Sequence, residues 1–345
     1  MLGLSERLQA LPDPEQQAAL LPLLYQAQAN DAYWHGLFGG LYLPHLRRAV
    51  YHAMVKLEQR LDQLSERSEC EQRDFDCDGK DELFLHNAEL QAILRLDGHA
   101  SVVELDAYAL SHNFGDTLAR QQEHYYRKLQ LSEQAPVANG NGIASPHDRV
   151  AFKHSISAED VQIDTRPRAL FLDRWLDADT QHSDLPPYQL DYQEAGIQGL
   201  SASFQAAVEV LKAHKTLRIN ANCLTAQYAF SGVPRGWFST ELNIAMPSCD
   251  GPAGRYEFQN SVPGGFGQVF EFEQLECISL ADEVLGGQLT LRTSHPVRLH
   301  AAPHFSVSQS EAGFEKIMQA LTLTLSWPLS TAQREISVTL EITRA

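Results

Sequence analysis

The sequence predicts a mainly β protein, a large antiparallel β-sandwich preceded by a short α-helical segment. Two observations predict this fold class. Up to residue 66, apolar residues recur at three- and four-residue intervals, which is the period of an amphipathic helix. From residue 67 onward, short runs alternate apolar and polar residues and are separated by Gly, Pro, Asn and Asp. Many short strands with few helices are typical of a sandwich.

Residues 1–66 are predicted to be helical and to form one unit. Asp13 is a suitable N-cap for a helix in which Pro14 takes the first position. A longer amphipathic helix is predicted from Leu43, with apolar positions at Leu46, Val50, Ala53, Leu57, Leu61 and Leu64. A unit of 66 residues is too small to build a self-sufficient core. We therefore expect it to pack against another domain or another chain.

Residues 67–345 are predicted to form the β-sandwich domain. The charged segment Ser65–Lys80 marks the boundary, and Ser132–Gly142 is a polar loop. The predicted strands are Leu90–Leu96, Ser101–Tyr108, Arg149–His154, Tyr188–Tyr192, Leu217–Asn220, Leu224–Phe230, Trp237–Ile244, Gly267–Phe272, Gln288–Arg292, Leu321–Trp327 and Ile336–Ile342.

Composition excludes several classes of partner. The chain of 345 residues has a formal charge of −17, which repels phosphate backbones and anionic lipid headgroups. We therefore expect no nucleic-acid and no membrane partner, whereas a neutral sugar is unaffected. No run approaches the ~18 apolar residues of a membrane helix, and the N-terminus lacks the pattern of a signal peptide.

The cysteines indicate a compartment. There are 5, an odd number, and none shows CxxC spacing. This pattern fits a reducing environment better than a disulfide framework. We expect a cytoplasmic protein.

The run NDAYWHGLFGG, Asn30–Gly40, has the residue types of a sugar site. Asp31 and Trp34 can present a carboxylate and a flat ring from the same turn. The ring would stack on the apolar face of a pyranose while the carboxylate accepts hydrogen bonds from its hydroxyls. The alternative is that Tyr33, Trp34 and Phe38 are core aromatics, and residue types alone favour it because aromatic stripes usually pack.

The run DFDCDGKDE has the spacing of a calcium loop. Carboxylates at alternate positions surround a tight turn, and Ca²⁺ takes six to eight oxygens at ~2.4 Å. The predicted ligands are Asp74, Asp76, Asp78, the backbone carbonyl of Lys80 and the carboxylate of Glu82. Loop position 12 is Leu85, so this is not an EF-hand. The alternative is a solvated acidic turn without a metal.

Four further residues fall in or beside predicted strands and could line a sugar-binding face of the sandwich: Trp237, Glu241, Arg174 and His304. Because such residues commonly pair and pack, the sequence favours a structural use for each.

The run Ala29–Arg47 resembles the last signature region of glycoside hydrolase family 57, above all its 4-α-glucanotransferases and related α-amylases. Further runs match in order: Asp74–Glu82, Gly142–Val150, Arg168–Leu176, Phe238–Asn243 and Val307–Glu315. The resemblance implies the helical end of a catalytic domain joined to a C-terminal sandwich similar to the galactose-mutarotase fold. It also implies transfer or hydrolysis of α-1,4-glucans (starch, glycogen or maltooligosaccharides) with retention.

The resemblance implies substrate-binding roles but no catalytic residue in this chain. Enzymes of that family use a Glu nucleophile and an Asp general acid on an N-terminal (β/α)₇ barrel, held ~5 Å apart. That barrel should precede Asn30, so we expect the chain alone to lack both groups. The matching positions imply that Asp31, Trp34 and His35 line the substrate site.

Two other functions remain open. The sandwich could be a stand-alone α-glucan-binding module that stacks sugars on Trp34, Trp175 or Trp237. Alternatively, the chain could be a docking subunit whose residues 1–66 bind a separate catalytic barrel or a second copy of the chain.

Overall fold

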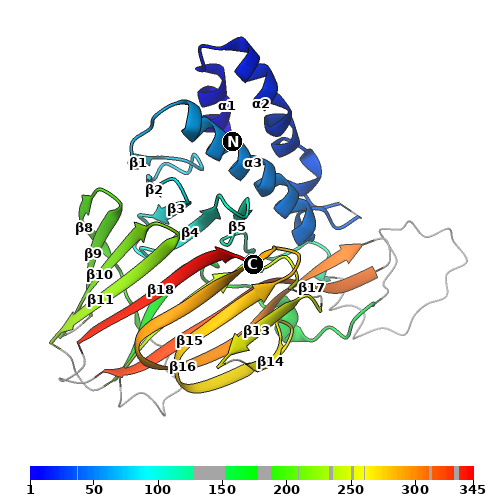
Figure 1. The fold of residues 1–345 in the computed structure, drawn as a ribbon. Helices are drawn as coiled ribbons and strands as arrows, with labels where there is room; N and C mark the ends of the chain where they lie inside the picture. Colours follow the sequence, from blue (N-terminus) through cyan, green and yellow to red (C-terminus); the bar gives the residue numbers. More distant parts are fainter. Residues whose placement is uncertain are drawn as a thin grey trace, which may run out of the picture.

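The computed structural model describes residues 1–36, 38–127, 152–177, 188–208, 210–232, 236–249, 252–259, 261–310, 313–329 and 334–345. Three helices lie at one end of a body built from antiparallel strands (Figure 1). The predicted fold class, a β-sandwich preceded by a short helical segment, is confirmed. None of the described helices is long and apolar enough to cross a bilayer.

The helical segment has a small core of its own. It consists of α1 (Leu2–Gln9), α2 (Pro14–Ala27) and α3 (Pro44–Leu64), with short 3₁₀ turns η1 (Asn30–Ala32) and η2 (Gly40–Tyr42) between α2 and α3. Asp13 caps α2, its Oδ1 accepting the Glu15 backbone N–H at 2.9 Å, as the sequence predicts. The buried leucines at the centre of this unit are Leu4, Leu8, Leu11, Leu24, Leu57 and Leu61.

The strands follow from residue 70. Their bounds are β1 (Cys70–Arg73), β2 (Glu82–His86), β3 (Leu90–Arg95), β4 (Val102–Ala107), β5 (His112–Asn113), β6 (Leu170–Asp177), β7 (Tyr188–Gln189), β8 (Gln193–Gln198), β9 (Ser201–Val208), β10 (Leu211–Asn220), β11 (Cys223–Ser231), β12 (Gly236–Ile244), β13 (Gly254–Phe258), β14 (Ser261–Gly265), β15 (Phe270–Asp282), β16 (Gly287–Ser310), β17 (Gly313–Leu329) and β18 (Glu335–Arg344). A 3₁₀ turn, η4 (Ala158–Val161), precedes β6.

One long strand joins the two layers of the sandwich. The first part of β16, Gly287–Thr293, pairs with β18, which continues through β11, β10 and β9 to β8. Its second part, Arg298–Ser310, pairs with β17, which continues through β12 to β6. A strand that changes sheets in this way makes a corner of the sandwich.

The core lies between these layers. Along β10, buried and more exposed residues alternate at every position, so one face of the strand is turned inward. The inward residues belong to a single large apolar cluster that includes Trp327. The exception is Lys215, which is fully buried and places Nζ 2.8 Å from Asp173 Oδ2. This pairing is what allows a charge to lie inside the core.

The sequence missed the strands β1, β2, β5, β6, β8, β9, β13 and β14. All five residues of β2 are buried, so the strand shows no alternation. β8 is polar and almost wholly exposed, so it shows no apolar signal. Period-two patterns detect only strands with one buried face.

Three predicted strands are shortened, start later or are replaced by an isolated bridge. The strand predicted at Tyr188–Tyr192 is formed only at Tyr188–Gln189, and the one predicted at Gly267–Phe272 begins at Phe270. Within the described part of Arg149–His154, Phe152 makes only an isolated bridge to Phe314. Residues 149–151, the predicted loop Ser132–Gly142 and the matched run Gly142–Val150 lie outside the described residues.

Several polar contacts join the helical segment to the sandwich. Arg47 Nε lies 2.8 Å from Asp116 Oδ1, and both side chains are nearly buried. Gln319 of β17 donates to the Tyr42 carbonyl at 2.9 Å. These contacts fix where the loop between α2 and α3 lies. The helix-to-strand change falls between Leu64 and Cys70; the domain division at residues 66 and 67 stays a prediction.

Candidate functional site

The glucan patch, which we define as Asp31, Tyr33, Trp34 and Phe38, is an exposed surface of the helical segment. The exposed fractions are 49% for Tyr33, 47% for Trp34 and 44% for Phe38. Asp31 is also exposed. The Trp34 and Phe38 rings meet edge to face, with centroids 5.5 Å apart. The alternative in which these aromatics are core residues is therefore wrong.

Glycines let the backbone fold tightly behind this patch. Gly40 has φ +51°, and a Cβ there would lie 2.2 Å from the carbonyl oxygen of Trp34. That same oxygen accepts the Leu41 backbone N–H at 3.0 Å. Only glycine fits such an approach, so the loop places Trp34 outward by closing on its backbone.

His35 lies on the inner side of the patch. Its ring centroid is 5.1 Å from that of Tyr125 and 5.4 Å from that of Tyr42, and its Nε2 lies 3.3 Å from Ser308 Oγ. Burial lowers the pKa of His35 below its usual value, so the imidazole is neutral at pH 7. Tyr42 in turn donates to Glu123. The substrate-binding roles of Asp31, Trp34 and His35 stay predictions.

The predicted calcium loop brings three of its carboxylates together. Asp74, Asp76 and Asp78 offer oxygens that all lie within 4.8 Å of one another. This donor set suits a hard cation. Arg95 Nη2 lies 2.8 Å from Asp76 Oδ2 and supplies part of the opposing charge.

The two remaining predicted calcium ligands, Lys80 and Glu82, do not belong to the group of three aspartates. Glu82 is buried in β2, and its Oε2 accepts the Phe75 backbone N–H at 2.8 Å. Lys80 lies two residues after Asp78 in the loop, and its backbone N–H donates to Asp78 Oδ1 at 2.9 Å. The loop geometry thus fits a cation at the three aspartates, and the calcium itself stays a prediction.

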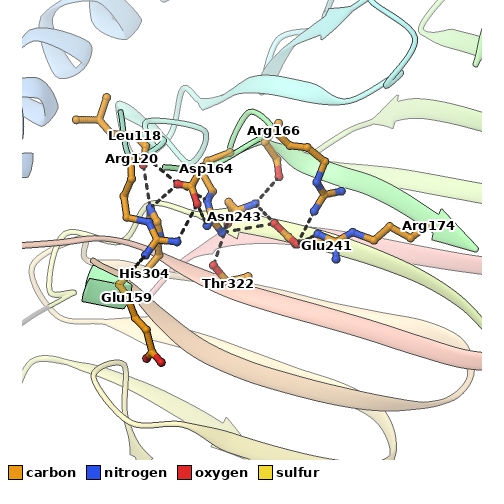
Figure 2. A network of polar contacts seen from close by, with 12 residues as sticks. Leu118, Arg120, Glu159, Asp164, Arg166, Arg174, Glu241, Asn243, His304 and Thr322 are labelled. Carbon is orange, nitrogen blue, oxygen red and sulfur yellow. Dashed lines mark hydrogen bonds and ion pairs between the residues drawn. The ribbon is translucent and has the colours of Figure 1, made fainter. Parts of the chain in front are cut away.

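A third candidate site lies on the sandwich. We call it the arginine pocket, and its charged residues are Arg120, Asp164, Arg166, Arg168, Arg174 and Glu241 (Figure 2). They surround a cavity of about 490 Å³. β6 supplies Arg174 and β12 supplies Glu241, while the segments before β6 supply the others.

Each carboxylate of the pocket holds several arginines. Asp164 accepts from Arg168 Nε at 3.2 Å and from Arg120 Nη2 at 2.9 Å. These hydrogen bonds outweigh burial and hold the pKa of the Asp164 carboxyl well below its usual range. Glu241 Oε2 lies 3.2 Å from Arg166 Nη2 and 3.0 Å from Arg174 Nη2 (Figure 2).

His304 lies against this network as a neutral group. Burial and the nearby Arg168 lower the pKa of His304 to about 4. Its Nε2 lies 3.0 Å from the Leu118 carbonyl oxygen and therefore carries the proton, which it donates (Figure 2). Nε2 is also 3.6 Å from Asp164 Oδ2.

The sequence found only part of this pocket. Glu241, Arg174 and His304 belong to one polar network (Figure 2). Trp237 does not line the pocket, and its ring lies 5.3 Å from the Arg298 guanidinium. Trp175 is only 3% exposed, so it cannot stack a sugar. Arg120, Asp164, Arg166 and Arg168 were missed; the sequence Arg-Pro-Arg before β6 was the one available signal.

Comparison with known families agrees with both parts of the fold. Residues 1–61 match the model described as "Alpha-amylase/4-alpha-glucanotransferase, middle domain". Residues 74–340 match the model described as "Alpha-amylase/4-alpha-glucanotransferase, C-terminal". The helices and the sandwich together thus define a protein of the amylase and glucanotransferase class. The chain belongs to the alpha-amylase/4-alpha-glucanotransferase family.

Individual relatives are distant but cover most of the chain. A 4-alpha-glucanotransferase of Thermococcus kodakarensis is 28% identical over 320 residues, 89% of this chain and 45% of the relative. An alpha-amylase of Pyrococcus abyssi is 27% identical over 324 residues, 88% of this chain and 45% of the relative. The chain therefore spans about half the length of these relatives.

Solved structures show the same fold. The 4-alpha-glucanotransferase from Thermococcus litoralis superimposes with a TM-score of 0.71 at 20% identity, covering 99% of this chain and 49% of that chain. A putative mutarotase from Salmonella typhimurium has a TM-score of 0.50 at 9% identity, covering 81% of this chain and 96% of that chain. The second likeness concerns the sandwich fold alone, and it agrees with the predicted galactose-mutarotase-like architecture.

Proposed function

We propose that this chain is part of an enzyme that acts on α-1,4-glucans, as a 4-α-glucanotransferase or an α-amylase. In this proposal Asp31 and Trp34 form one wall of the substrate site. Family membership supports the glucan. The single observation that carries the assignment to these residues is that Asp31 and Trp34 are both exposed in the short segment between α2 and α3.

The chemistry of the patch suits a neutral sugar. The Trp34 ring offers a flat apolar face for a pyranose, and a well-placed ring contributes about 1 kcal/mol. The Asp31 carboxylate offers oxygens that accept hydrogen bonds from hydroxyls. Because the ligand is uncharged, the chain's charge of −17 does not oppose its approach.

This chain alone is proposed to bind glucan without cleaving it. No residue of it is assigned as nucleophile or general acid; a catalytic barrel completes the site. Purified protein incubated with maltoheptaose should leave the oligomer distribution unchanged. New maltooligosaccharides would overturn this part of the proposal.

Binding is tested by affinity electrophoresis in gels that contain amylose. The wild type should be retarded, Trp34→Ala should run as it does in a gel without amylose, and Trp237→Ala should behave as the wild type. Trp237 is a matched control because its partly exposed ring lies on the sandwich, under Arg298. Equal retardation of wild type and Trp34→Ala would contradict the assignment.

The helical segment is also proposed to carry the docking face for that barrel. Leu2 and Tyr25 are 75% and 61% exposed on α1 and α2, which is unusual for large apolar side chains. Self-association through the same face is the other possible outcome. Size-exclusion chromatography of wild type and Tyr25→Glu distinguishes them, because only a self-associating chain elutes later after the substitution.

A structural calcium is proposed at Asp74, Asp76 and Asp78. Added Ca²⁺ should raise the melting temperature of chelator-treated protein by a few degrees, because a ligand that binds only the folded state stabilises it. Asp78→Asn should abolish the rise, and Asp81→Asn should keep it, since Asp81 instead accepts from Gln72. No calcium effect in the wild type would overturn the site.

A cytoplasmic location is proposed from the thiols. Cys70, Cys77, Cys223 and Cys277 are free thiols, which suits a reducing compartment. Fractionation of cells that express the whole protein is the test.

A further inference from the structure

The arginine pocket carries more positive than negative charge. Four guanidinium groups, which are permanently protonated, face two carboxylates. His304 is neutral at pH 7 and adds no charge. The network thus keeps an excess of two positive charges, in a chain whose formal charge is −17.

The arrangement also leaves donors for a ligand. Arg166 and Arg174 place one nitrogen each on the same oxygen of Glu241. A guanidinium has five N–H donors in a planar fork that matches the oxygens of a phosphate or carboxylate. Figure 2 shows the two arginine side chains approaching Glu241 from different directions, so the Glu241 carboxylate keeps both guanidinium groups close to one another.

The size and lining of the cavity point to a small hydroxylated molecule. About 490 Å³ is within the range of pockets that enclose small ligands. Among the described lining residues, only Ile163 and Pro167 are apolar. Gln162 and Thr165 add groups that hydrogen-bond to hydroxyls. A lining of this kind does not suit an apolar ligand.

We infer that the arginine pocket binds the phosphate monoester of a small sugar. A phosphate monoester carries a charge of about −2 at neutral pH, which matches the excess of the network. Arg166 and Arg174 would hold the phosphate oxygens, and the polar lining would hold the sugar hydroxyls. Glu241 and Asp164 keep the arginines in place.

This site is separate from the glucan patch. It lies on β6 and β12 of the sandwich, whereas Asp31 and Trp34 lie before α3. It recognises charge, and the glucan patch recognises a neutral ring. The inference therefore does not depend on the proposed glucan function.

Isothermal titration calorimetry of the full chain tests it, with glucose 1-phosphate, inorganic phosphate and glucose as probes. Glucose 1-phosphate should bind, inorganic phosphate should bind more weakly, and glucose should give no heat. Arg174→Gln should weaken glucose 1-phosphate binding about tenfold or more, because a charge-assisted contact is lost. Glu241 keeps Arg166 and Arg168 as partners in this variant, so the fold is retained.

Arg292→Gln is the matched control. Arg292 is an exposed arginine in the part of β16 that pairs with β18, and its Nε lies 3.5 Å from Glu341 Oε2. Its substitution should leave binding unchanged. Trp34→Ala should also bind the sugar phosphate normally. No binding of any phosphate probe, or equal weakening by Arg174→Gln and Arg292→Gln, would overturn the site. Equal affinity for inorganic phosphate and glucose 1-phosphate would contradict the inference that the pocket also contacts the sugar.

Discussion

The helical segment and the sandwich are held in place by different forces. The sandwich has one large apolar cluster between its layers, whereas the helical segment encloses only a few leucines. The helices meet the sandwich through ion pairs and hydrogen bonds, with Arg47 on Asp116 and Tyr51 on Glu104. Polar contacts thus help to fix the position of the glucan patch. We expect its geometry to be more sensitive to pH and to single polar substitutions than the sandwich is.

The largest effect is expected from Asp116→Asn. It leaves the Arg47 guanidinium, only 5% exposed, without its charged partner, and breaking such a pair costs about 3–5 kcal/mol. Urea denaturation measures the change. Glu257→Gln is the control, because its pair with Arg255 is exposed and contributes about 0–1 kcal/mol. Equal losses in the two variants would contradict a polar junction between the two parts.

Leu61→Ala should come next. Leu61 is fully buried in the core of the helical segment, and such a truncation costs about 2–5 kcal/mol. The loss should be local. Hydrogen exchange should show faster exchange in α2 and α3 while β10 and β11 stay protected. Equal acceleration in β10 would mean that the two parts unfold as one.

Gly40→Ala should distort the glucan patch at a cost of about 1–3 kcal/mol. The new Cβ would meet the Trp34 carbonyl, and the positive φ adds strain. Gly79→Ala separates the two effects, because Gly79 also has positive φ but open space around its Cβ position. Gly40→Ala should lose amylose binding and Gly79→Ala should keep it. Loss of amylose binding in both variants would contradict a local effect of the contact between residue 40 and Trp34.

The smallest effect concerns pH. Burial raises the pKa of Glu104, beside α3, to about 7, and burial together with the Glu104 charge raises that of Asp106. An acid whose pKa is raised on folding favours the folded state when protonated. Its contribution is therefore complete below about pH 4, the usual range of the unfolded carboxyl, and is lost as pH rises to 7.

Glu104→Gln should remove this dependence, so the variant should lose less stability than the wild type between pH 5 and 8. Tyr51 can still donate to the amide oxygen of glutamine. Urea denaturation at several pH values gives the comparison, with exposed Glu257→Gln as control. Parallel curves for Glu104→Gln and the wild type would show that Glu104 is ionised throughout this range.

Local signals predicted much of this fold. The cap at Asp13, the long helix α3 and the alternating strands β10, β11 and β18 depend on neighbours in sequence, so they were visible. β2 and β8 were missed because one is buried throughout and the other is exposed throughout. Period alone cannot report a strand without two different faces.

The sites divide in the same way. The loop of Asp74, Asp76 and Asp78 is contiguous and was found. The exposure of Trp34 was not predictable from residue type, because it depends on the close approach of Gly40 to the Trp34 backbone. The arginine pocket unites residues from Arg120 to Glu241, which only the folded sandwich brings together.

The most direct test of the glucan patch follows the indole N–H signals in a ¹⁵N-labelled chain titrated with maltoheptaose. The chain has 4 tryptophans. Trp175 and Trp327 are buried, and Trp237 lies under Arg298. The signal of Trp34, identified by its absence in Trp34→Phe, should shift alone. A shift of Trp237 instead, or no shift at saturating sugar, would contradict the proposal that Asp31 and Trp34 contact the glucan.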